Sequence, residues 1–114
     1  MKFQLAKTLE GLKMYGPIYD LSSGIPDKVE EYRIEDINDW FLDNMVIKIN
    51  SYCDTLLDDG DVDYIDAKRC KNLIEMIDDL PADFVPDEFT EAIKVLRSFA
   101  QRAIEYNTGI EIEM

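Results

Sequence analysis

Apolar residues recur every three or four positions between residues 35 and 57 and form one continuous pattern. This spacing is typical of one face of an α-helix, which has 3.6 residues per turn. The face consists of Ile37, Phe41, Met45, Ile49, Tyr52 and Leu56. Trp40, Ile47 and Cys53 widen it, so we expect a central helix that packs on two sides, with Trp40 largely buried and the end near Gly60.

Two later segments show the same helical period. Residues 64–80 place their apolar side chains on one side, with Asp63 as the expected N-cap and Pro81 as the stop. The last helix is expected from Pro86 or Asp87 to Asn107. Residues 2–15 carry leucines at helical spacing, and we favour a helix there, although the alternation KFQLAK also allows a short strand.

The remaining segments lack a helical period. Residues 16–31 are rich in glycine, proline and serine, and they predict a long loop over the core. Residues 110–114, IEIEM, alternate apolar and acidic side chains and could form an edge strand against residues 29–34, or a frayed tail. The sequence therefore predicts a single all-α domain over residues 1–114, a small antiparallel helical bundle of about four helices, with a short two-stranded ornament as an option.

Charge is the most unusual property of the composition. The chain has 114 residues with 25 acidic and 12 basic side chains, which gives a formal net charge of −13. Such an excess repels nucleic acid and anionic membranes and attracts cationic surfaces. The charge either keeps the protein soluble or indicates binding to a basic partner.

The acidic residues follow the polar side of the expected central helix and continue into the turn after it. Lys48 is the only basic residue between Arg33 and Lys68, whereas a solvated helix usually mixes both signs. We therefore predict a protein-binding site with Tyr64 as an aromatic anchor beside acidic residues. The acidic members are Asp39, Asp43, Asp54, Asp58, Asp59 and Asp61.

The sequence offers no catalytic signature. Without histidine, a histidine-assisted serine or cysteine nucleophile cannot form, and no phosphate-binding glycine motif is present. We expect no enzyme activity and no cofactor.

Residues 58–66, DDGDVDYID, resemble half of a calcium-binding loop. Thr55 and Leu57 would occupy the first and third ligand positions of an EF-hand, where carboxylates are needed. We therefore predict a helix–turn–helix corner and no specific metal site, with weak surface binding of a divalent ion left open.

Two cysteines, Cys53 and Cys70, fall within apolar patterns and are expected to be buried thiols. The N-terminal sequence lacks the continuous apolar core of a signal peptide, and no run of about 20 apolar residues could span a bilayer. These features predict a cytoplasmic protein.

In size, acidity, lack of histidine and cytoplasmic character, the chain resembles the small immunity proteins of bacterial toxin–immunity systems. The resemblance is to a class and includes no shared motif, so no functional residue is carried over. It implies a basic toxin partner, often a nuclease, whose active site the protein occludes. The alternatives are a nucleic-acid mimic that inhibits a defence nuclease, a metal-responsive regulatory module using residues 58–66, and an accessory subunit of an enzyme.

Overall fold

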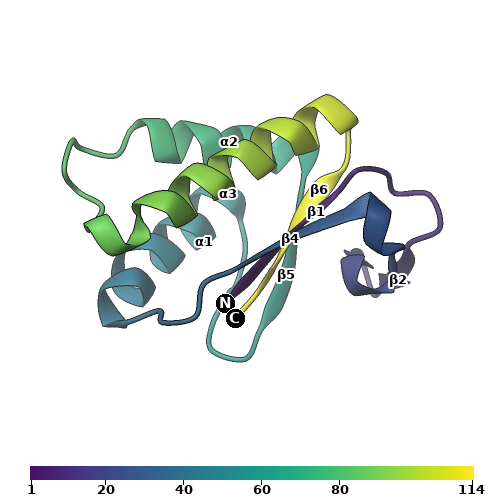
Figure 1. Ribbon diagram of the computed structural model, residues 1–114, viewed down its shortest axis with the longest axis horizontal. Helices are drawn as coiled ribbons and strands as arrows, with labels where there is room; N and C mark the ends of the chain where they lie inside the picture. The colour runs from purple at the N-terminus through teal and green to yellow at the C-terminus, as the bar shows by residue number, and fades with distance from the viewer.

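The computed structural model describes residues 1–114 and shows an α+β fold, in which helices pack on one face of an antiparallel sheet (Figure 1). The sheet has the strand order β4–β1–β6–β5. Its strands are β1 (Lys2–Ala6), β4 (Val29–Arg33), β5 (Val62–Asp66) and β6 (Gly109–Glu113), and a separate hairpin joins β2 (Lys13–Tyr15) and β3 (Ile18–Asp20). The helical elements are the short turns η1 (Leu21–Ser23) and η2 (Pro26–Lys28), the π-helical η3 (Phe41–Val46), α1 (Ile47–Cys53), α2 (Ala67–Asp78) and α3 (Asp87–Tyr106). The prediction of an all-α helical bundle is therefore wrong.

The first strand explains most of this difference. Phe3 and Leu5 in β1 lie opposite Ile112 and Ile110 in β6, and all four side chains belong to the core beneath the helices. Successive strand residues point to opposite faces, so this pairing needs the period of two that KFQLA carries. The leucines that follow do not continue a helix, because Leu9 packs on the other side of the sheet. The helix predicted over residues 2–15 is a strand followed by a loop and β2.

The C-terminal strand lies inside the sheet. Residues 29–33 and 109–113 are both strands, as the sequence allowed, but they do not pair with each other because β1 lies between them. β6 has β1 on one side and β5 on the other. A strand in this position is covered more fully than the expected edge strand.

The helices begin and end partly as predicted. α3 follows Pro86 and ends where Asn107 adopts a left-handed conformation with φ of 53°. α2 begins at Ala67, with Asp66 as its N-cap, because residues 62–66 form β5. The central helix ends at Cys53, and Asp54 takes the left-handed conformation with φ of 54°.

None of the helices combines the length and the apolar composition that spanning a membrane requires.

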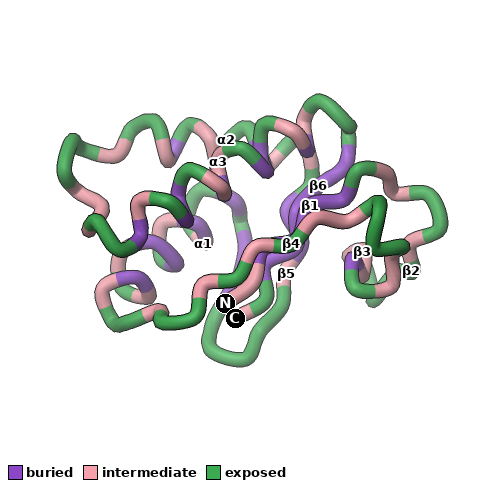
Figure 2. The backbone as a smooth tube through the Cα atoms, viewed as in Figure 1, coloured by how far each residue is buried: buried purple, intermediate pink, exposed green.

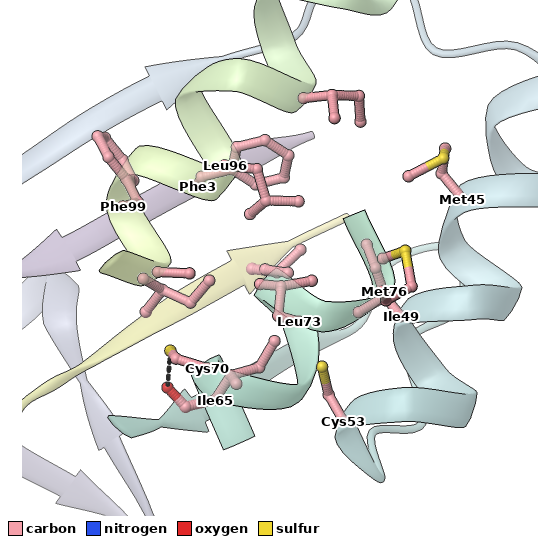
Figure 3. Close-up of a cluster of buried hydrophobic side chains, with 14 of the residues drawn as sticks. Phe3, Met45, Ile49, Cys53, Ile65, Cys70, Leu73, Met76, Leu96 and Phe99 are labelled. Carbon is pink, nitrogen blue, oxygen red and sulfur yellow. Dashed lines mark hydrogen bonds between the residues drawn. The ribbon is translucent and has the colours of Figure 1, made fainter. Parts of the chain in front are cut away.

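One main core fills the space between the sheet and the helices. In the close-up of Figure 3, Phe3 of β1 lies beside Leu96 and Phe99 of α3. Cys53 and Cys70 are buried free thiols, which confirms the expectation from their apolar surroundings. Burial raises the pKa of Cys53 to about 11 and that of Cys70 to about 12.

Trp40 joins the start of the central helix to α3. The indole ring is half-buried, and its centroid lies 5.6 Å from the ring of Phe84 and 5.8 Å from that of Phe89. We expect Trp40→Ala to lower the free energy of unfolding by about 3 kcal/mol, because these contacts are lost and a cavity forms. Urea denaturation measures the change, and Tyr15→Ala is the control because that side chain is 77% exposed. An unchanged midpoint for Trp40→Ala would contradict this packing.

Candidate protein-binding surface

Residues 54–61 form an ordered loop between α1 and β5, here called the acidic loop. Asn50 of α1 fixes its first half with a single amide side chain. The Asn50 Nδ2 donates to the carbonyl of Leu57 at 2.9 Å, and its Oδ1 accepts from the Leu57 amide at 2.8 Å and from the Thr55 hydroxyl at 2.7 Å. Thr55 and Leu57 are both buried, so these bonds hold the loop against the core.

Arg69 of α2 secures the C-terminal end of α1, where the loop begins. Its guanidinium donates to the carbonyl of Cys53 at 3.1 Å and also to the carbonyl of Tyr64 in β5. Carbonyls at a helix C-terminus have no partner within the helix, and a cation there also opposes the negative end of the helix dipole. The first half of the loop is also joined to β5, because the Leu56 amide donates to Asp63 Oδ2 at 3.2 Å.

The acidic loop presents charge and one bare apolar side chain. Its four predicted site residues are all exposed: Asp54, Asp58, Asp59 and Asp61. Figure 2 shows most of this segment, between α1 and β5, as exposed backbone. Leu56 was expected in the core but is 86% exposed. Protein interfaces generally combine an apolar centre with a polar rim, and the loop offers both kinds of side chain.

The two remaining predicted aspartates lie at the opposite end of the helix. Asp39 and Asp43 are exposed. The fifteen-residue separation from Asp39 to Asp54 corresponds to roughly 20 Å along a helix. Lys48 lies between them in sequence, and its ammonium group sits 5.5 Å from the centre of the Phe84 ring. The structure thus gathers four of the predicted aspartates in one loop and leaves two apart.

Tyr64 does not lie on this surface. Its side chain is 5% exposed and packs with Ala6 and Leu21 against the sheet face that the helices leave open. The centre of its ring is 5.5 Å from that of Tyr19 in β3. Burial also raises the pKa of its hydroxyl. The expectation of an exposed aromatic anchor at Tyr64 is corrected on this ground, and the exposed apolar side chain of the loop is Leu56.

Residues 58–66 do not form the expected helix–turn–helix corner, because they lead from the loop into strand β5. No group of three or more cysteine, aspartate or glutamate side chains is close enough to hold a metal ion. Asp63 contacts the amide of Leu56 and caps no helix.

A second feature lies on the sheet face opposite the helices. The hairpin β2–β3 and the end of the sheet enclose a depression of about 260 Å³, here called the hairpin hollow. Its lining combines aromatic, aliphatic and acidic side chains: Tyr15, Ile18, Tyr19, Asp20, Ser22, Val62, Glu111 and Glu113. The Glu111 side chain accepts a hydrogen bond from the Leu21 amide at 3.1 Å, and the residue is only 4% exposed.

The sequence contains one signal for this hollow. In the pattern IEIE, two core isoleucines at positions 110 and 112 require Glu111 to point to the other face. On the expected edge strand that face would be solvated. Glu111 is buried because β6 lies between two strands and the segment around Leu21 covers it.

Comparisons of the chain with models of protein families, with curated proteins and with solved structures found no match.

Proposed function

We propose that this protein is an acidic inhibitor that binds a basic protein partner. The most direct form of this function is an immunity protein that neutralises a cognate toxin of the nuclease class by occluding its active site. The observation that supports it is the acidic loop, which carries four exposed aspartates and an exposed leucine on a backbone held by Asn50 and Arg69.

The acidic loop is held in place before any partner binds, and this favours binding. A flexible segment pays conformational entropy when it binds, whereas a loop already held in place loses less freedom. The charges around Leu56 would attract a cationic surface over a distance, and Leu56 would fill an apolar recess on contact. The net charge of −13 adds a long-range attraction between the whole protein and the same cationic surface.

We also propose that the protein acts in the cytoplasm. Support comes from Cys53 and Cys70, which stay free thiols inside the core, as is usual in a reducing compartment.

Replacing Asp54, Asp58, Asp59 and Asp61 with lysine should slow association with the basic partner and flatten its salt dependence. Opposite charges raise association rates above about 10⁶ per molar per second at low salt, and screening removes this gain as the Debye length falls to about 3 Å at 1 M. The first candidate partner is the product of the neighbouring gene, since immunity proteins act on a cognate toxin. Surface plasmon resonance across salt concentrations gives both rates.

A matched control reverses four exposed acidic residues in α2, at its C-cap and in α3: Glu75, Asp79, Glu91 and Glu105. It changes the net charge by the same amount but leaves the acidic loop intact. We expect it to slow association much less than the loop variant does. Equal slowing by both variants would mean that only total charge matters, and the loop would lose its assigned role.

A further inference from the structure

The hairpin hollow has apolar walls and an acidic floor. Tyr15 is 77% exposed and Val62 is 42% exposed, and both line the opening together with Ile18. Glu111 of β6 contributes the buried carboxylate, and Asp20 of β3 is close by in the same lining. A ligand that fits must therefore be apolar along its length and cationic at its tip.

Glu111 has no positive partner in the protein. Its one hydrogen bond is the contact with the Leu21 amide, and it takes part in none of the ion pairs. Lys2 is near, but its ammonium pairs with Glu113 at 3.0 Å. Burial raises the pKa of Glu111, and the charges of Asp20 and Glu113 raise it further. Burying a carboxylate without a cation is unfavourable, so an incoming cation would remove that cost.

A second buried acceptor lies beside Glu111 on the same sheet face. Gln4 of β1 is the cross-strand neighbour of Glu111 and is only 6% exposed. Its Oε1 is buried and has no hydrogen-bond partner. The Leu21 amide donates the one hydrogen bond that the structure shows to this pair of acceptors, and buried acceptors are normally satisfied. Gln4 itself lines a neighbouring depression with Leu21 and Glu31, so within the hairpin hollow the acceptor is Glu111.

We propose that the hairpin hollow receives an arginine side chain of the protein partner. A guanidinium group offers five N–H donors in one plane, forms paired hydrogen bonds to a carboxylate and stacks on tyrosine rings. Its head would bind Glu111, its plane would lie against Tyr15, and its methylene groups would contact Ile18 and Val62. The inference relies on the proposed function only for the nature of the partner, a basic protein.

The hollow borders the acidic loop, so one partner could use both. Val62 in its lining directly follows Asp61, and the amide of Met114 donates to the Asp61 carbonyl at 2.8 Å. Glu113 is opposite Val62 in the sheet register. A partner arginine in the hollow would thus lie next to the partner's other cationic groups, which would contact the acidic loop.

The test is an NMR titration of the full-length protein with N-acetyl-arginine methylamide, with the isosteric but uncharged citrulline derivative as the ligand control. We expect saturable shifts of the amides around Ile18, Val62 and Glu111 in the millimolar range with the arginine compound alone. Glu111→Gln should weaken binding by about tenfold or more, because a charged hydrogen bond is lost. The glutamine Oε1 can still accept from the Leu21 amide, which preserves the fold. Glu105→Gln on the exposed face of α3 is the protein control.

Two results would overturn the inference: unsaturable shifts spread over all acidic residues, or saturable binding that Glu111→Gln leaves unchanged. Tyr15→Ala removes the stacking ring but leaves the charge of Glu111, and it should also weaken binding of the arginine compound. The titration needs no partner, so it is independent of the kinetic test of the acidic loop. Failure of the loop variants would refute the proposed function, and failure of the titration would refute only the arginine site.

Discussion

Replacing Gly109 with alanine is expected to lower the free energy of unfolding by about 3 kcal/mol or more, because overpacking in a closed core forces side chains and backbone to move. A Cβ atom at this position would overlap the ring of Tyr64 and come within 2.5 Å of the Ile65 carbonyl oxygen. Both obstacles belong to β5, the strand that pairs with β6 at this point. Chemical denaturation followed by circular dichroism measures the loss.

A second variant distinguishes the two obstacles. In Gly109→Ala combined with Tyr64→Leu, the phenol ring is absent while the Ile65 carbonyl remains, so we expect partial recovery relative to the sum of the single changes. If Gly109→Ala alone denatured at the wild-type midpoint, the Tyr64 ring could not lie across Gly109, and the packing of the open sheet face would need revision.

The helices were predictable where the period was long. α3 extends over Asp87–Tyr106, and its start after Pro86 and end at Asn107 follow from proline and asparagine signals in the sequence. The short strands gave weaker signals. In residues 2–15 the spacing of Leu5, Leu9 and Leu12 matches a helix, but these side chains lie on opposite faces of the sheet. The pattern cannot reveal that, since the separation depends on pairing with β4 and β6.

The two candidate surfaces also differ in how far the sequence predicts them. Exposed aspartates such as Asp58 and Asp59 could be predicted because charged residues in a turn remain in water. The hairpin hollow could not be predicted, because the contact that buries Glu111 joins it to Leu21 across 90 positions of sequence. Tyr64 was misplaced for a related reason: in VDYID the tyrosine faces the side opposite Ile65, and that side is covered by the segment around Leu21.

Asn50→Ala should lower the free energy of unfolding by about 2–3 kcal/mol and release the acidic loop. Three hydrogen bonds are lost at once, and both backbone groups of Leu57 are left without a partner in a region where Thr55 and Leu57 are 3% and 4% exposed. Amide hydrogen exchange at Leu57 should accelerate strongly, because its protecting bond to Asn50 is gone. Equilibrium denaturation and exchange measured by NMR give both quantities on one sample.

Two variants isolate the role of the amide in this prediction. Asn44→Ala removes one hydrogen bond, to the Trp40 carbonyl at 2.9 Å, from the same helical segment and should leave exchange at Leu57 unchanged. Asn50→Asp keeps the acceptor for Thr55 and Leu57 but loses the donor to the Leu57 carbonyl, so its effect should be intermediate. Once a partner is identified, Asn50→Ala should also weaken binding to it although every charge is retained. The reason is that the acidic loop no longer holds its aspartates in place before contact. Unchanged exchange at Leu57 in Asn50→Ala would show that the loop is ordered by other contacts, and Arg69 would then be the residue to replace.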